Sequence, residues 1–134
     1  MKPIIGITMG DAAGIGPEII VKALSLKDIY EVCCPIVIGD LKVMEQAVKI
    51  VGVYLKVNPI SDIREAKFEF GTIDVLDLRN IDFSVLKIGQ VDAMVGKAAV
   101  EYIEKAVDLA LRNEIHAIAT APINKEAINK AGYN

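Results

Sequence analysis

The chain has 134 residues, of which 53% are hydrophobic and 25% are charged. This length suits one domain with a sizeable core, and so apolar a composition excludes a disordered chain. The formal net charge is −3, and the sequence has no basic run, which excludes the basic face that a nucleic-acid-binding protein needs.

The expected location is the cytoplasm, without a membrane span. Uncharged apolar stretches such as 115–123 are too short to cross a bilayer, and residues 1–6 lack the long apolar segment of a secretory signal. Cys33 and Cys34 are adjacent, so they cannot form a long-range bridge with each other. We expect two buried free thiols, and a redox role is the less favoured alternative.

Short apolar runs alternate with amphipathic segments along the chain, which predicts β–α units around a largely parallel sheet. The first strand is expected at 4–8, and a glycine-rich loop follows at 9–16. Pro17 suits the first turn of a helix, where its missing N–H costs nothing. Further strands are predicted at 35–38, 54–57 and 73–78, with a helix at 41–51 that Asp40 caps and Gly52 ends.

The segment 58–71 has the weakest signals. Pro59, Ser61 and Asp62 indicate a loop or a single turn, whereas Phe68 and Phe70 alternate as they would in an edge strand. A surface excursion is expected at 79–90.

A long helix at 91–112 is the clearest prediction, because apolar residues form one stripe at helical spacing. Small residues on this stripe, including Gly96, Ala98 and Ala106, should let the helix lie close to the sheet. A strand at 115–120 and a helix at 124–131, capped by Asn124, follow it.

The first candidate functional segment is Gly10–Glu18, between the first strand and its helix. Loops at the carboxyl ends of parallel strands bind ligands in open α/β sheets, and a helix N-terminus favours anions. The glycines at 10, 14 and 16 match neither G-x-G-x-x-G nor a P-loop. A tight turn and a ligand-facing loop therefore remain equally open. The helix dipole explains Glu18, whereas capping does not readily explain Asp11, which is the better functional candidate.

The second candidate segment is Thr120–Lys125, again between a strand and a helix. A lysine in the first turn opposes the helix dipole, and such a residue is better tolerated when it meets a phosphate or a carboxylate. A lysine that simply points into solvent is the alternative. His116 is the only histidine, so a structural role is expected for it, and no Cys/His cluster with metal-ligand spacing occurs.

Both segments resemble signatures of the 4-hydroxythreonine-4-phosphate dehydrogenase family. Residues 7–18 resemble the opening signature T-x-G-D/E-P-A-G-I-G-P-E/D, with Ala12 where the family has proline. Residues 120–127, with Ala131 and Gly132, resemble the second signature, and 89–99 resembles the segment leading into the family's long helix. The resemblance covers essentially the whole chain.

The resemblance implies an α/β fold of the isocitrate/isopropylmalate dehydrogenase type, with α/β/α layers, of which residues 1–134 would be the N-terminal portion. It further implies a homodimer that oxidises a phosphorylated hydroxy acid with NAD (or NADP), after which the β-keto acid loses carbon dioxide. A divalent metal, most often zinc and otherwise magnesium or cobalt, would be bound by histidines that lie beyond Asn134.

The implied substrate is 4-phosphooxy-L-threonine, on the route to pyridoxal phosphate, with D-threonate or D-erythronate 4-phosphate as the alternative. Only weaker roles transfer to residues of this chain. Thr8 and Asp11 would lie at the floor of the substrate cleft, with Thr120 beside them, and Lys125 would lie near the substrate phosphate or carboxylate. No catalytic, cofactor-binding or metal-binding residue can be assigned.

Other interpretations remain open. The phosphate acyltransferase group is thought to share this fold, but the Gly10–Glu18 signature speaks against that activity. If the polypeptide ends at Asn134, it would be a non-catalytic binding or dimerisation module. A piece of a longer enzyme is favoured over that module, because half of a two-lobed α/β protein would expose apolar surface.

Overall fold

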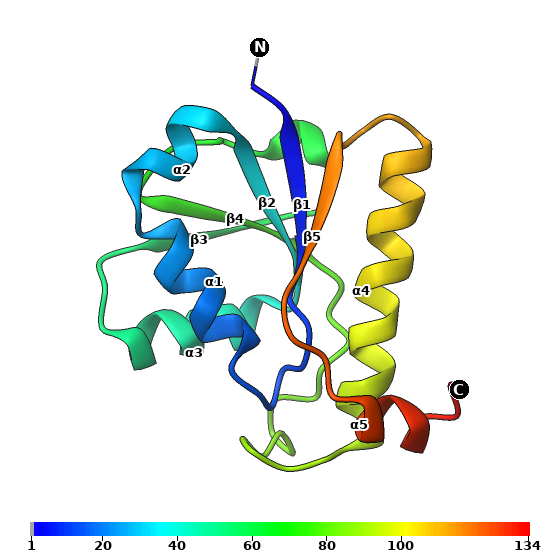
Figure 1. The fold of residues 1–134 in the computed structure, drawn as a ribbon. Coiled ribbons are helices and arrows are strands. Elements are labelled where there is room, and N and C mark those ends of the chain that lie inside the picture. Colours follow the sequence, from blue (N-terminus) through cyan, green and yellow to red (C-terminus); the bar gives the residue numbers. More distant parts are fainter. Residues whose placement is uncertain (1) are drawn as a thin grey trace.

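The structure, a computed structural model, describes residues 2–134 (Figure 1). Helices and strands alternate through most of the chain. In chain order they are β1 (Ile4–Thr8), α1 (Gly16–Leu24), α2 (Lys27–Val32), β2 (Cys34–Gly39), α3 (Leu41–Val51), β3 (Lys56–Ile60), the 3₁₀ helix η1 (Ile63–Glu65), β4 (Thr72–Asp77), α4 (Ala93–Leu111), β5 (Ala117–Thr120) and α5 (Lys125–Lys130). None of the helices in the described residues is long and apolar enough to cross a membrane.

The strands form one parallel sheet in the order β3-β4-β2-β1-β5. Helices α1, α2 and α3 lie on one face of the sheet and α4 lies on the other (Figure 1). This arrangement confirms the expected α/β fold with helices on both faces, because parallel strands need crossover connections that cover the sheet.

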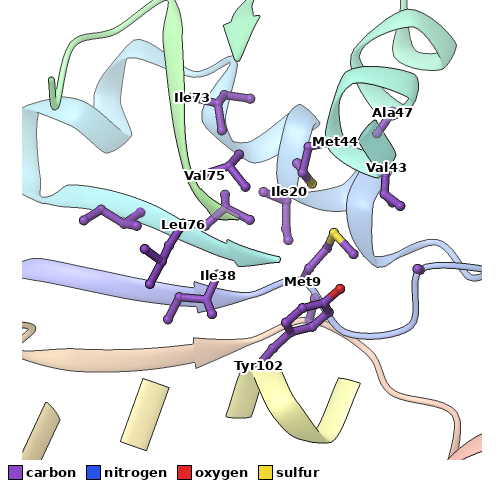
Figure 2. Close-up of a cluster of buried hydrophobic side chains, with 14 of the residues drawn as sticks. Met9, Ile20, Ile38, Val43, Met44, Ala47, Ile73, Val75, Leu76 and Tyr102 are labelled. Carbon is purple, nitrogen blue, oxygen red and sulfur yellow. The ribbon is translucent and has the colours of Figure 1, made fainter. Parts of the chain in front are cut away.

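The core lies on both faces of β2 and β4, whose central side chains are buried. Figure 2 shows Ile20, Met44 and Val75 on the side of α1 and α3, and Tyr102, from α4, on the other side. The Tyr102 hydroxyl donates a 2.7 Å hydrogen bond to Asn80 Oδ1. Burial strongly raises the pKa of Tyr102, so this ring stays neutral and serves as a core residue with a satisfied polar end.

The third strand differs from the prediction in its position. It was expected at 54–57, but β3 covers Lys56–Ile60 and Tyr54 is fully exposed. The strand includes Pro59, which the sequence analysis assigned to a loop. An edge strand tolerates proline because the missing N–H can face away from the sheet, and β3 pairs only with β4.

The predicted edge strand at Phe68 and Phe70 is wrong. Phe68 has a left-handed backbone with φ of 53°. Asp74, on β4, accepts hydrogen bonds from the backbone N–H groups of Lys67 and Phe68 (3.1 and 2.9 Å) and from Asn58 Nδ2 (2.8 Å). A buried carboxylate therefore holds this segment as a turn, and the alternation of two phenylalanines was a coincidence of spacing.

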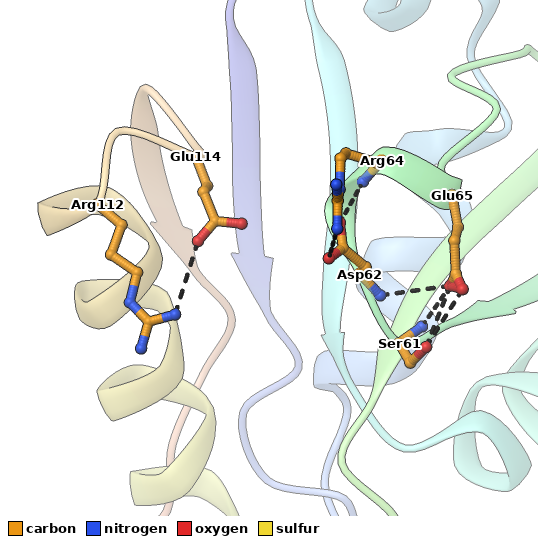
Figure 3. Close-up of polar contacts among 6 residues, drawn as sticks. All are labelled: Ser61, Asp62, Arg64, Glu65, Arg112 and Glu114. Carbon is orange, nitrogen blue, oxygen red and sulfur yellow. Dashed lines mark hydrogen bonds and ion pairs between the residues drawn. The ribbon is translucent and has the colours of Figure 1, made fainter.

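Helix η1 precedes that turn in the chain, and a hydrogen-bonded network of residues 61–65 holds it in place (Figure 3). Asp62 accepts from the Arg64 N–H at 2.8 Å, and Glu65 accepts from the Ser61 N–H at 2.9 Å. The hydrogen bonds from Arg64 lower the pKa of Asp62 to about 2. Because these side chains are solvent-exposed, the network orders the turn locally and adds little to global stability.

Helix α4 confirms the long predicted helix, and Asp92 caps it by accepting from the Met94 N–H at 2.8 Å. The expected role of Gly96 needs correction. Its nearest neighbour outside the helix is the backbone of Ala127, so the close approach at this residue is to α5 instead of the sheet.

Two smaller differences concern α2 and the cysteines. Helix α2 was not predicted, because its six residues are too few for a clear periodic pattern. Cys33 and Cys34 are free thiols as expected, but they are partly exposed and not buried.

Candidate functional site

The two candidate segments lie together where the order of the strands reverses. From β1 the chain passes to β2 on one side, and much later it returns to β5 on the other side. Thr8 and Thr120, the last residues of β1 and β5, are register partners. Ligands in open parallel sheets bind in the crevice at such a reversal, outside the carboxyl ends of the strands. The topology therefore places both sequence signatures at the expected position for a site.

The two segments contact each other through their backbones. The Ala121 N–H donates to the Thr8 carbonyl at 3.1 Å, and the Asp11 N–H donates to the Pro122 carbonyl at 3.0 Å. Gly10 has φ of 74°, and a Cβ there would run into the Pro122 carbonyl oxygen. A Cβ at Gly16 would lie 2.6 Å from the Met9 carbonyl oxygen. Close packing of protein segments thus explains both glycines, without an anion in the loop.

The third segment that the resemblance singled out joins the same cluster. The Gly89 N–H donates to the Ala13 carbonyl at 2.6 Å, which closes the excursion before α4 onto the β1–α1 loop. At the start of α4, the Gly96 backbone lies directly against Ala127 of α5. All three signature segments are therefore in contact near the carboxyl ends of β1 and β5.

Thr8 and Asp11 lie inside this cluster. Thr8 is fully buried, and its Oγ1 has no hydrogen-bond partner among the described residues. Asp11 is 8% exposed, and its Oδ1 accepts from the Ala13 N–H at 2.8 Å. Burial raises the pKa of the Asp11 carboxyl, and the hydrogen bond from Ala13 partly opposes that rise. In the described part of the chain, neither the Thr8 nor the Asp11 side chain is open to solvent.

Thr120 and Lys125 are exposed at the same edge. Asn124 accepts from the Ala127 N–H at 3.0 Å and caps α5 as predicted, which places Lys125 at the first position of that helix. Lys125 has no ion-pair partner among residues 2–134, and it lines a hollow with Ile123 and Ile128. An exposed, unpaired ammonium group at this edge is available to an anion.

The structure therefore brings Thr8, Asp11 and Thr120 to one place, with Lys125 a few residues further along the chain. Their assignment to a substrate cleft stays a prediction. The contact of Gly96 with α5 in this cluster was not predicted from the sequence. Its signal was a glycine inside an otherwise strong helix, which usually has a packing reason.

His116 has the structural role that was expected. Its Nδ1 accepts from the Ile4 N–H at 2.9 Å, and the backbone N–H of His116 donates to the Ile4 carbonyl at 2.8 Å. Within residues 2–134, no group of three or more His, Cys, Asp or Glu side chains could hold a metal ion. The described residues therefore do not fit a metal centre.

Comparison with known proteins identifies the family. The sequence profile described as "Pyridoxal phosphate biosynthetic protein PdxA" matches residues 31–134. A protein of Clostridium botulinum (strain Hall), named "Putative D-threonate 4-phosphate dehydrogenase", is 53% identical over 133 residues, which are 99% of this chain and 40% of that protein. A Fusobacterium nucleatum protein of the same name is 50% identical over 134 residues, which are all of this chain and 40% of that protein.

The solved structures agree. The crystal structure of a 4-hydroxythreonine-4-phosphate dehydrogenase from Burkholderia phymatum matches with a TM-score of 0.96 and 50% identity, over 99% of this chain and 40% of that one. This chain thus spans about 40% of the length of these relatives. Since the family profile covers most of the chain, the chain belongs to the PdxA family.

Proposed function

We propose that this chain is part of a cytoplasmic, homodimeric dehydrogenase that oxidises a phosphorylated four-carbon hydroxy acid with NAD (or NADP). The main support is that the fold matches that of a 4-hydroxythreonine-4-phosphate dehydrogenase over 99% of this chain, at 50% sequence identity. When bound, the nicotinamide would accept a hydride from the substrate carbinol carbon, and the hydroxyl proton would be released. The resulting β-keto acid then loses carbon dioxide.

The first candidate substrate is 4-phosphooxy-L-threonine, on the route to pyridoxal phosphate. The second is D-threonate 4-phosphate, because curated relatives at 53% and 50% identity have that name. Both molecules have a phosphate and a carboxylate, and they differ in having an amino or a hydroxyl group at carbon 2. D-erythronate 4-phosphate belongs to the same second class.

The residues of this chain would bind one end of such a substrate. Lys125 is exposed and lacks an acidic partner in the described part of the chain, which suits a contact with the phosphate or the carboxylate. Thr120 would add a hydroxyl donor beside it. Thr8 and Asp11 are buried at the end of β1 and in the loop that follows it, where the Asp11 carboxylate accepts from the Ala13 N–H.

We also propose that the enzyme binds a divalent metal, with zinc as the first candidate, through ligands that lie outside residues 2–134. The side chains described here do not form a site for it, and no step of the reaction is assigned to it. The positions that bind the cofactor are proposed to lie outside these residues as well.

An intact-mass measurement and an activity assay on the protein from its natural source test this function. We expect a mass more than double the 14.5 kDa of this chain. NADH should form with 4-phosphooxy-L-threonine or with D-threonate 4-phosphate, and the preferred substrate decides between the two candidates. A mass of 14.5 kDa would remove the claim of catalysis and leave a binding or dimerisation module. Acyl-phosphate formation without NADH would indicate an acyltransferase instead.

A further inference from the structure

A glycine inside α4 has no conformational explanation. Gly96 is the fourth residue of the helix, and its φ is not positive. Glycine is less favourable than alanine within a helix, so something other than backbone freedom must require it. A Cβ at this position would overlap the Ala127 carbonyl and would lie 2.5 Å from the Ile128 nitrogen. The backbone of α5 thus occupies the space where a side chain would be.

The same segment of chain is held at its other end by two further glycines, Gly10 and Gly16. A Cβ at Gly10 would run into the Pro122 carbonyl oxygen, and one at Gly16 would lie 3.2 Å from Ala121 Cβ. The obstacles at Gly96 and Gly10 are backbone atoms, which cannot rotate away as a side chain can. Residues 121–128 are therefore fixed at both ends by contacts that only glycine permits.

Lys125 lies between these two contacts. Ala121 and Pro122 precede it, and Ala127 and Ile128 follow it within α5. The six residues of α5 give the helix little stability of its own, so the position of the lysine depends on the contact with α4. Displacement of α5 would move the Lys125 ammonium away from an anion bound at the carboxyl edge of β5.

We propose that Gly96 is a positioning residue that seats α5 against α4 and so fixes the substrate-facing position of Lys125. This inference rests on the proposed function, in which Lys125 meets the phosphate or the carboxylate of the substrate. Gly96 itself contacts no substrate. Its contribution is the absence of a side chain at the point where the two helices cross.

The test is Gly96→Ala in the natural full-length protein. Loss of a contact that binds the substrate and the transition state equally raises KM and leaves kcat nearly unchanged. We expect KM for the phosphorylated substrate to rise about tenfold, as for a lost charged contact, with kcat changed less than about threefold. The matched control is Lys97→Ala, an exposed neighbour on the same turn whose replacement also favours the helix and adds no contact. An unchanged KM in Gly96→Ala would overturn the proposal.

A double-mutant cycle separates positioning from general damage. Lys125→Ala removes the ammonium group, so adding Gly96→Ala to it should raise KM no further. If the two effects on KM multiply, Gly96 does not act through Lys125 and the proposal fails.

Hydrogen exchange of the α5 amides tests the helix contact without any assay of activity. Gly96→Ala should speed amide exchange at Ala127 and Ile128, and Lys97→Ala should not. Equal exchange rates in both variants would contradict the proposed contact between α4 and α5.

If Gly96→Ala does not fold, Asn124→Ala replaces it, because that substitution loosens α5 by removing its N-cap. Faster exchange with an unchanged KM in Asn124→Ala would overturn the positioning role. If the wild type forms no NADH, the proposed function fails, and the exchange data still decide whether Gly96 seats α5.

Discussion

At the scale of single residues, Asp74 is a buried carboxylate that accepts several hydrogen bonds from the turn before β4 and from β3. It is 1% exposed and accepts from the N–H groups of Lys67 and Phe68 and from Asn58 Nδ2. Asp74→Ala would leave these donors unpaired, so we expect a loss of about 3 kcal/mol in the free energy of unfolding. Asp74→Asn keeps one acceptor oxygen and should lose less.

Urea unfolding measures both Asp74 variants. Glu69→Ala, at an exposed position in the same turn, is the control and should cost less than about 0.5 kcal/mol. A loss for Asp74→Ala no larger than that of the control would mean that water replaces the carboxylate without cost.

Asp11 predicts a dependence of stability on pH. Burial raises its pKa above 3.8 in the folded state, so the folded protein binds this proton more tightly than the unfolded chain does. The stability linked to Asp11 is therefore fully present below about pH 4 and is lost as pH rises through the raised pKa. Asp11→Asn keeps the acceptor for the Ala13 N–H and removes the titration.

The free energy of unfolding of wild type and Asp11→Asn, compared between pH 3 and pH 7, checks this expectation. The free energy of unfolding of Asp11→Asn should increase relative to that of the wild type as pH rises. Asp40, whose pKa burial also raises, is present in both proteins and cancels in the difference. A constant difference between the two proteins over this range would contradict the prediction.

At the scale of elements, both ends of α3 follow from the sequence. Asp40 Oδ1 accepts from the Val43 N–H at 3.2 Å, and Gly52 ends the helix in the left-handed region with φ of 78°. A Cβ at Gly52 meets nothing within 4 Å, so only backbone strain opposes a side chain there. Gly52→Ala should therefore cost about 1 kcal/mol in thermal or urea unfolding, and Gly52→Asn should cost less. Equal costs for the two variants would rule out the strain explanation.

How well each element could be predicted depended on where its signal originates. Helix α4 has a long periodic stripe and explicit capping, so local sequence determines it. The turn at Phe68 depends on Asp74, which no local pattern connects to it. Pro59 was assigned to a loop because proline is rare in strands, but the edge position of β3 appears only once the strand order is known.

The candidate site divides in the same way. Glycine-rich and proline-containing loops after short apolar runs placed both signatures at the carboxyl ends of strands, and the topology confirms that placement. The contacts between the signatures join residues more than a hundred positions apart, such as Asp11 and Pro122. Contacts of that kind depend on tertiary packing, so the sequence could indicate an unusual glycine at 96 without indicating what lies against it.

At the scale of the whole molecule, the protection of backbone amides against hydrogen exchange should decrease from the centre of the sheet to β5. Strand β2 lies between β1 and β4, and Ile36, Val37 and Ile38 are fully buried, whereas β5 pairs only with β1 and is exposed throughout. In a polypeptide of residues 1–134, amide hydrogen exchange should be at least about a hundredfold slower in β2 than in β5. Similar rates in both strands would indicate that the sheet opens as one unit.

The position of β1 between β2 and the late-made strand β5 also affects synthesis on the ribosome. Ile4 receives its partner His116 from 112 residues further along the chain. At typical elongation rates, the side of β1 that pairs with β5 waits roughly 6 to 22 s before that partner is made. An apolar strand with an unpaired edge is the kind of segment that associates wrongly during such an interval. Residues 4–8 are therefore the part of the nascent chain where we expect chaperone binding to matter most.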